Sequence, residues 1–233
     1  MELRAILFDT FGTLVDWRGS LIEMLGAWGA ERGVAADWAG LADAWRGEYA
    51  PDMDRVRRGE LPWTILDALQ RASLARLAPR FGLHLDDEAL DQLTLFWHRL
   101  RPWPDSAPGL ARLRRRFLLA PLSNGNVALL ADLARYAGLP FDTIFGADVF
   151  QRYKPDPETY LGACHLLSAP PDQVMMCAAH NYDLAAARRL GLRTAFIARP
   201  TEHGPGQTRD LAPEQDWDVV ASSAEEVADR LGC

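Results

Sequence analysis

A largely apolar run at residues 3–8 ends at Asp9, and a turn containing Gly12 follows directly. A short apolar run bounded by a turn is typical of a buried strand in a parallel sheet. The pattern therefore places one carboxylate, with exposed backbone N–H groups around it, at the end of a strand. The alternative interpretation is that Asp9 only caps the turn.

Position 11, two residues after Asp9, is Phe11, so no second acid stands beside the first. A lone carboxylate suits nucleophilic attack on a carbon atom that carries a good leaving group. It suits phosphate-ester cleavage less well, because an alkoxide leaving group requires a proton from a neighbouring acid. The residues around Asp9 therefore favour substitution at carbon over phosphoryl transfer.

The 233 residues suffice for one large α/β domain, or for a core domain and a smaller one. The net charge of -7 argues against a nucleic-acid partner, because such binding depends on basic surfaces. No apolar stretch approaches the roughly 20 residues of a membrane span, so we expect no membrane partner. Cys164, Cys177 and Cys233 are widely spaced and form no metal-ligand pattern, which predicts reduced thiols in a cytoplasmic protein.

Two kinds of pattern divide the rest of the chain. Residues 15–100 carry apolar side chains at helical spacing, and we expect no strand among them. Short apolar runs then alternate with helical segments, and the expected strands are 117–122, 143–146, 174–179, 194–198 and 219–220. This alternation predicts an α/β fold with a doubly wound parallel sheet and a helical insertion after the first strand.

Polar side chains follow four of the predicted strands. Asp9 follows the first strand, Ser123 and Asn124 follow the second, Lys154 lies near the third, and residues 180–183 follow the fourth. Ligands of open parallel sheets bind at the carboxyl ends of the strands. We therefore expect a nucleophile, a hydroxyl group, an amide, a cation and a second carboxylate to lie on one rim.

Residues 9–13, Asp-Thr-Phe-Gly-Thr, resemble the first motif of the haloacid dehalogenase superfamily, in the form carried by its type II 2-haloacid dehalogenases. The four rim segments match the four motifs of that superfamily in order, across nearly the whole chain. The resemblance implies a Rossmann-like core domain formed by residues 1–15 and 103–233, with an inserted helical cap domain formed by residues 16–102. A homodimer is a possible assembly, because many members of the family form dimers.

The resemblance implies hydrolytic dehalogenation of short 2-haloalkanoic acids. Asp9 would displace the halide ion from C2 to form an ester, and water would hydrolyse that ester to a 2-hydroxy acid, with no metal or other cofactor. Lys154 would keep Asp9 ionised and attract the anionic substrate, and Thr13 would fix the Asp9 carboxylate by a hydrogen bond.

The loop before Asp183 departs from the family pattern, because it reads Ala-Ala-His-Asn where Ser-Ser-Asn is usual. Asp183 would orient or deprotonate the hydrolytic water. His180 replaces the Asn of the family and is the alternative base, since its unperturbed pKa lies near neutrality. The altered loop also makes fluoroacetate a hypothetical substrate.

The predicted binding residues lie on both parts of the chain. Residues 44–46, Ala-Trp-Arg, resemble the cap segment that carries a halide-binding arginine, so Arg46 would cradle the departing halide. Donors placed where charge develops lower the barrier selectively. The other predicted contacts to halide or substrate are Asn124, Ser123, Thr10, Phe11, Trp45, Tyr160 and Asn181.

Several of these residues have a purely structural alternative. Arg46 is also consistent with an exposed helix charge, Ser123 with a helix N-cap, and His180 with a hydrogen-bonded histidine at a strand end. Phe11, Trp45 and Tyr160 are consistent with ordinary core residues.

Two rival functions remain on the sequence alone. The first is a magnesium-dependent phosphatase of the same fold acting on a small phosphate ester, with Asp9 and Asp183 around the metal ion. Phe11 and Ala179 stand where such an enzyme places further acids, which argues against it. The second is an inactive scaffold, which would have no reason to retain a nucleophile opposite a cation.

Overall fold

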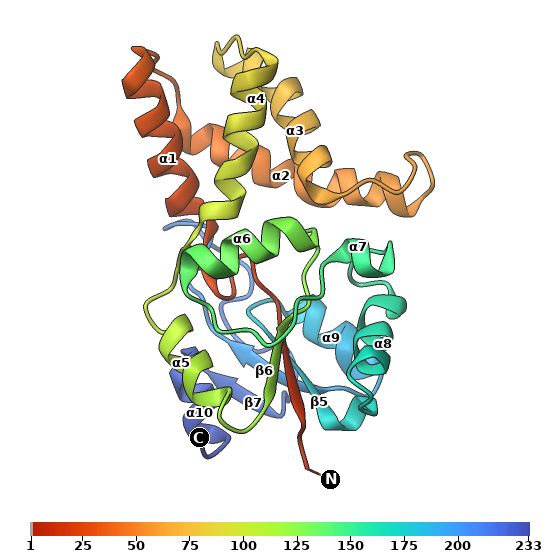
Figure 1. The fold of residues 1–233 in the computed structure, drawn as a ribbon. Coiled ribbons are helices and arrows are strands. Elements are labelled where there is room, and N and C mark those ends of the chain that lie inside the picture. Colours follow the sequence, from red (N-terminus) through yellow and green to blue (C-terminus); the bar gives the residue numbers. More distant parts are fainter. Residues whose placement is uncertain (1) are drawn as a thin grey trace.

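The computed structural model of the protein describes residues 2–233. Its centre is a five-stranded parallel sheet in the order β4-β1-β5-β6-β7 (Figure 1). The strands are β1 (Ala5–Phe8), β4 (Leu118–Pro121), β5 (Val174–Ala178), β6 (Arg193–Ile197) and β7 (Val219–Ala221). The first strand of the chain is therefore a central strand, which its continuous apolar run requires.

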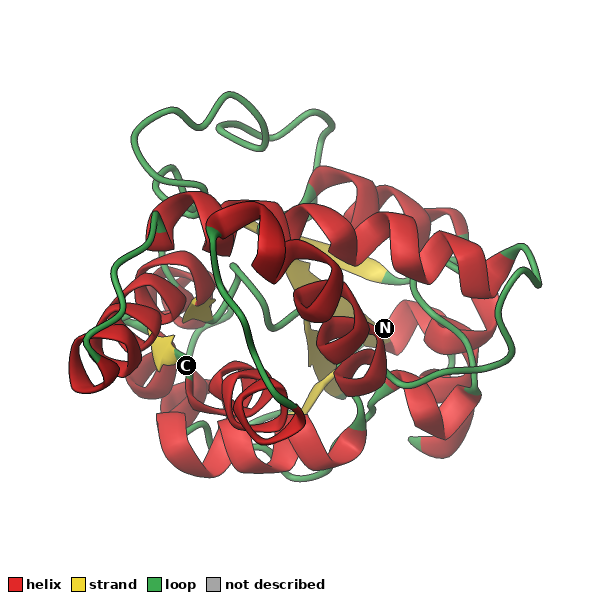
Figure 2. Cartoon of the chain, turned by 90° about the horizontal axis from the view of Figure 1, so that it is seen from above, coloured by secondary structure: helices red, strands yellow, loops and turns green. Residues whose placement is uncertain are grey.

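Helices cover both faces of this sheet. Those of the sheet-containing part are α5 (Ser106–Leu113), α6 (Val127–Ala137), α7 (Ala147–Phe150), α8 (Pro157–Leu166), α9 (Asn181–Arg189) and α10 (Ala224–Arg230), with the 3₁₀ turn η3 (Pro171–Gln173). Successive residues of β1 enter different clusters, because Ile6 and Phe8 pack on one face and Leu7 packs on the other. Seen from above, helices hide most of the sheet (Figure 2). The predicted doubly wound α/β fold is confirmed.

A separate group of helices lies over the carboxyl end of the sheet (Figure 1). It consists of α1 (Trp17–Arg32), α2 (Trp38–Arg57), α3 (Leu66–Leu77), η1 (Ala78–Phe81), α4 (Asp87–Thr94) and η2 (Leu95–Arg99). The chain enters and leaves this group through an antiparallel ribbon of β2 (Val15–Asp16) and β3 (Arg101–Pro102). The expectation that residues 15–100 contain no strand was therefore wrong at their first two residues.

Residues 143–146 do not form the strand that their apolar character predicts. Phe145 donates one backbone hydrogen bond to Pro121 and accepts one from Ser123, which gives an isolated bridge at Leu122. The chain then turns at Gly146 into α7. The segment lies at the end of the edge strand β4 but is too short to extend the sheet.

One hydrophobic cluster joins the helical group to the sheet. It contains Phe8 of the sheet, Phe11 of the turn after it, and Leu25, Trp45 and Trp97 of the helical group. Because apolar burial is the main favourable term in folding, the two parts stabilise each other across this contact. Among residues 2–233, no helix combines the length and the apolar character that a membrane span requires.

Gly109 of α5 allows the close packing of α5 against α10. A Cβ atom at this position would lie 2.5 Å from the carbonyl carbon of Ala224, which is backbone and has no room to move. We expect Gly109→Ala to lower the free energy of unfolding by about 1–3 kcal/mol, the usual cost of overpacking. Urea denaturation measures this change.

Gly26→Ala is the matched control, because its Cβ would meet only Trp38, at 3.8 Å. Replacing this helical glycine should stabilise the protein by about 0.5–1 kcal/mol, through the higher helix propensity of alanine. Equal effects of the two substitutions would contradict the proposed packing at Gly109.

Candidate active site

Asp9 lies directly after β1, and three side chains hold its carboxylate. Thr13 donates to Oδ2 at 2.6 Å, His180 Nδ1 lies 3.1 Å from the same oxygen, and Lys154 donates to Oδ1 at 3.0 Å. Burial alone raises the pKa of the Asp9 carboxyl, but Lys154, His180 and Thr13 outweigh this effect and hold that pKa well below its usual range. Asp9 is therefore ionised inside the protein.

Lys154 lies between two carboxylates. Its Nζ donates to Asp9 and, at 2.5 Å, to Asp183 Oδ2, and all three side chains are buried. Burial lowers the pKa of the Lys154 ammonium, but the charges of Asp183 and Asp9 raise it by a larger amount, so the net shift is upward. The other oxygen of Asp183 accepts the Tyr160 hydroxyl at 2.5 Å. Asp183 thus holds Lys154 against Asp9.

His180 lies between Asp9 and a third carboxylate, Glu202. Its Nδ1 faces Asp9, and its Nε2 lies 3.1 and 3.0 Å from the two oxygens of Glu202. Burial lowers the pKa of His180, but the charges and hydrogen bonds of Glu202 and Asp9 raise that pKa to about 10. The ring is consequently an imidazolium at neutral pH, and in this state neither nitrogen has a lone pair to take a proton from water.

A cavity of about 360 Å³ opens beside these groups. The residues that line it are Arg46, Gly47, Tyr49, Ala50, Met53, Arg57, Asn124, Lys154, Pro155, His180, Tyr182, Arg209 and Asp210. Arg46 reaches it from α2 and stacks on the Tyr49 ring, with its guanidinium carbon 4.0 Å from the ring centre. The buried Nε of Arg46 has no hydrogen-bond partner in the described residues. An unpaired cation therefore lines the same cavity as Lys154 and His180, the two cations that hold Asp9.

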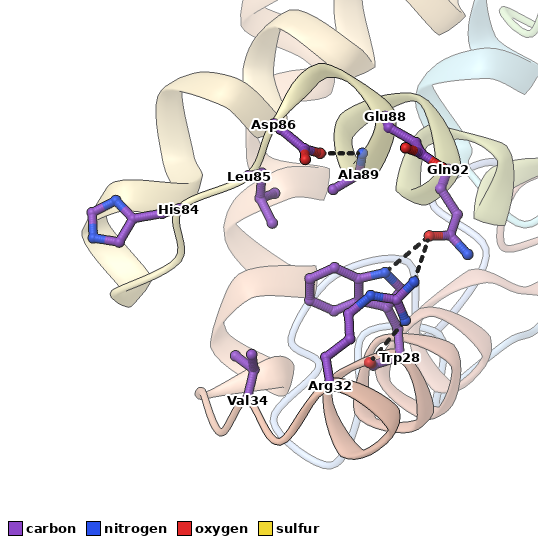
Figure 3. A pocket seen from close by; sticks show the side chains of 9 residues that line it. All are labelled: Trp28, Arg32, Val34, His84, Leu85, Asp86, Glu88, Ala89 and Gln92. Carbon is purple, nitrogen blue, oxygen red and sulfur yellow. Dashed lines mark hydrogen bonds between the residues drawn. The ribbon is translucent and has the colours of Figure 1, made fainter.

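A second hollow lies at the outer tip of the helical group, between the end of α1 and the beginning of α4 (Figure 3). Trp28 and Arg32 both donate to the Gln92 side chain there, and the Arg32 guanidinium stacks on Trp28. These contacts tie the two helices together. None of the residues that hold Asp9 lines this hollow.

Comparisons with known proteins agree with this geometry. A family profile described as a haloacid dehalogenase-like hydrolase matches residues 3–191. The chain belongs to this family. It is similar to (S)-2-haloacid dehalogenase 4A of Burkholderia cepacia, with 31% identity over 97% of this chain and 99% of the relative.

Two solved structures are similar over nearly the whole chain. The L-2-haloacid dehalogenase PA0810 has a TM-score of 0.96 and 59% identity, and the match covers 98% of each chain. The defluorinating L-2-haloacid dehalogenase Rha0230 has a TM-score of 0.97 and 44% identity, covering 99% of this chain and 96% of that one. The family and the Rossmann-like fold with a helical cap, both expected from the sequence, are confirmed.

The loop between β4 and α6 brings two predicted binding residues of this haloacid dehalogenase-like hydrolase to the rim. Asn124 lines the cavity, and its Oδ1 accepts the backbone N–H of Lys154 at 2.7 Å. Ser123 is buried, and its hydroxyl accepts the backbone N–H of Gly125 at 3.3 Å, a local turn contact. Ser123 is not the helix N-cap that the structural alternative describes, because the N-cap of α6 is Asn126. Thr10 is also buried, and its hydroxyl has no partner among the described residues.

Four other predicted binding residues lie outside the lining of the cavity. Phe11 and Trp45 each meet Trp97 edge-on in the shared cluster, and the Trp45 indole donates to a backbone oxygen. Tyr160 lies against Asp183. Asn181 uses both ends of its amide to hold residues 210–217, since it donates to Asp210 and Ala212 and accepts from Glu214 and Trp217. Both ends of the Asn181 amide are thus engaged within the protein, and its substrate contact stays a prediction.

Sequence reasoning missed Glu202, which is buried and belongs to the loop after β6. That loop has no hydrophobic periodicity, so no pattern marked one of its acids as special. The one sequence feature connected with Glu202 is Gly12, because a Cβ atom at this position would lie 2.1 Å from the Glu202 carboxylate. The glycine of the first motif therefore leaves room for this side chain, and its positive φ of 86° suits glycine.

The donor set around Asp9 does not fit a magnesium ion. Both Asp9 and Asp183 direct an oxygen at the Lys154 ammonium, which takes the space between them. Among residues 2–233, the group of side chains with metal-ligand spacing is His180, Glu202 and His203, which does not include this pair. A hard cation with oxygen ligands would have to displace the lysine.

Glu202→Gln should lower the pKa of His180 from about 10 toward its ordinary value, because Glu202 contributes the largest upward charge effect on the ring. A histidine with a raised pKa stabilises the fold fully below pH 6.5, and this contribution disappears as pH rises to about 10. The wild-type ring should thus stay protonated from pH 6 to 9, and the variant ring should titrate there.

NMR titration of the His180 ring nitrogens measures both states. Glu226→Gln is the control, since Glu226 is an acid on α10 that contacts Ser222 and Arg230 instead. An unchanged His180 titration in Glu202→Gln would show that Glu202 does not hold the imidazolium.

Proposed function

We propose that this haloacid dehalogenase-like hydrolase converts short 2-haloalkanoic acids to 2-hydroxy acids through an ester on Asp9. The proposal rests chiefly on one observation: an ionised, buried Asp9 is held by Lys154, with Phe11 in place of a second acid. The (S)-2-haloacid dehalogenase and L-2-haloacid dehalogenase relatives support it. The similarity to a defluorinating L-2-haloacid dehalogenase supports fluoroacetate as one of the substrates.

The first step is displacement at C2. Asp9 Oδ1 accepts one hydrogen bond and Oδ2 accepts two, so Oδ1 is the freer nucleophile. A new C–O bond forms while the carbon–halogen bond breaks, and the electron pair leaves with the halide ion. Lys154 and Arg46 offset the repulsion between the carboxylates of enzyme and substrate. The halide leaves without a proton, so this reaction does not need an acid at position 11, where the chain has Phe11.

The second step needs a base, and we assign that role to His180. Ester formation neutralises Asp9 and removes one of the two charges that keep His180 protonated. The ring then releases its Nδ1 proton to solvent, while Glu202 still holds Nε2–H. The free Nδ1 takes a proton from water as the water attacks the ester carbonyl. The bond between the carbonyl carbon and Oδ1 then breaks, and the 2-hydroxy acid leaves with Oδ1 as its alkoxide receives that proton back from Nδ1. The Asp9 carboxyl finally transfers its proton to Nδ1, which restores the ionised Asp9 and the imidazolium. Asp183 has both oxygens engaged and serves as the positioning partner of Lys154.

The same proposal assigns residues 16–102 as a cap domain on a core domain of residues 1–15 and 103–233. The ribbon of β2 and β3 lies at both boundaries and is the expected hinge. Arg46 comes from the cap, whereas Asp9 and Lys154 come from the core. Closure of the cap would bring the two halves of the site together and expel water during the displacement.

The proposal also extends to location and assembly. Cys164, Cys177 and Cys233 form no disulfide in the structure, which agrees with a reducing cytoplasm. A homodimer is the assembly that the family resemblance suggests, and light scattering coupled to size-exclusion chromatography tests it.

Asp9→Asn should abolish halide release, because the amide is not a nucleophile. Ion chromatography after incubation with fluoroacetate, chloroacetate, bromoacetate and 2-chloropropionate measures the released halide, with excess EDTA throughout. Wild-type protein should release halide under these conditions. Undiminished halide release by the variant would show that Asp9 is not the nucleophile. Hydrolysis of p-nitrophenyl phosphate that needs Mg²⁺, in place of halide release by the wild-type protein, would overturn the proposal in favour of the phosphatase.

His180→Asn should leave the first step active and block the second, so the ester should accumulate. Intact-protein mass spectrometry after incubation with 2-chloropropionate detects the adduct, and Asp9→Asn, which cannot form it, is the control. Rapid ester turnover in His180→Asn, together with accumulation in Asp183→Asn, would transfer the role of base to Asp183.

A further inference from the structure

Tyr49 is an aromatic residue between Arg46, the proposed halide-binding residue, and the part of the site that contains Lys154 and Asp9. It lies on α2, one helical turn after Arg46, and lines the cavity together with Asn124 and Lys154. Its ring stacks against the Arg46 guanidinium and meets Phe11 edge-on, with ring centres 6.2 Å apart. Nothing in the sequence pattern distinguished it from an ordinary half-buried helix residue.

The orientation of the Asn124 amide bears on which groups can accept the proton of the Tyr49 hydroxyl. Asn124 Oδ1 already accepts the backbone N–H of Lys154, so the amide presents its NH₂ group on its other side. The Asn124 side chain lies near enough to the Tyr49 hydroxyl to lower its pKa. The NH₂ group of Asn124 can only donate, so it does not take up the Tyr49 proton.

The Tyr49 proton is consequently available to another partner. In the part of the chain that the structure describes, the Tyr49 O–H donates to no carboxylate or carbonyl oxygen, although Asp9 and Lys154 are near enough to influence its pKa. Burial raises that pKa, with Asp9 acting in the same direction and Arg46 against it, so the phenol keeps its proton. An O–H group that lines the cavity beside an unpaired guanidinium can donate to an anion in the cavity.

We propose that the Tyr49 hydroxyl is a hydrogen-bond donor to the departing halide, acting beside Arg46 and Asn124. This inference rests on the proposed dehalogenase function. As Asp9 forms the C–O bond, the carbon–halogen bond breaks and its electron pair becomes localised on the halide. Tyr49 stabilises that charge by a hydrogen bond and transfers no proton. Its ring also fixes the Arg46 guanidinium by stacking, so the two donors converge on one place.

The proposed donor makes the rate depend on the leaving group in a specific way. A smaller halide concentrates its charge and accepts stronger hydrogen bonds, so losing one donor should slow chloride departure more than bromide departure. A merely structural role of Tyr49 would slow both substrates by the same factor. The ratio of the two rates therefore separates donation to the halide from general support of the fold.

Tyr49→Phe is the decisive variant, because it removes the hydroxyl and keeps the ring that stacks on Arg46. Single-turnover halide release with enzyme in excess isolates carbon–halogen cleavage, with (S)-2-chloropropionate and (S)-2-bromopropionate as substrates. We expect the chloride rate to fall roughly tenfold, the upper range for one neutral hydrogen bond, and the bromide rate to fall clearly less. Chloride should also become a weaker product inhibitor.

Tyr136→Phe, at an exposed tyrosine on α6, is the matched control and should leave both rates unchanged. Equal slowing of both substrates by Tyr49→Phe, or unchanged rates and unchanged chloride inhibition, would overturn the inference and leave the proposed function intact. Absence of halide release from the wild-type protein would instead overturn the proposed function. Circular dichroism of the folded variant separates these outcomes from misfolding.

Discussion

Two buried cations keep Asp9 ionised, and the rest of the site depends on this contact. Asp183, Lys154, Asp9, His180 and Glu202 form a chain of alternating charge, each within hydrogen-bond distance of the next. Burying a charge costs much unless it is paired, and in this chain every charge has an opposite neighbour. The three carboxylates and two cations carry one net negative charge, which is available for nucleophilic attack by Asp9.

The fold makes this chain of charges possible by bringing separate strand ends to one rim. Asp9 follows β1, His180 and Asp183 follow β5, and Glu202 lies in the loop after β6. These three strands are neighbours in the sheet, so their carboxyl ends lie side by side. Lys154 comes from the segment between α7 and α8, and Asn124 holds its backbone in place. The sheet order thus determines which charges can meet.

The sequence predicted the parts of the fold and site that leave a local pattern. The first strand, the helical insertion and the rim positions of Asp9, Lys154 and Asp183 were visible because periodicity and strand ends are local features. Glu202 and Tyr49 left no such signal, because their importance arises from contacts with residues distant in the chain. The strand predicted at residues 143–146 was wrong because apolar character does not determine how far a segment pairs: this one forms a single bridge, at Leu122, before the chain turns at Gly146.

The sheet rim and the helical group contribute different groups to the site, and the chemistry of the leaving group explains this difference. The nucleophile needs a fixed electrostatic environment, and the rigid sheet rim supplies it through side chains that touch one another. The halide needs donors on the opposite side of the reacting carbon, because displacement occurs from the back. The donors that we propose, Arg46 and Tyr49, come from α2 of the helical group, which lies over the rim. Opening of the cap would therefore separate the nucleophile from the donors to the leaving group. Closure of the cap over a bound substrate would bring the nucleophile and these donors together.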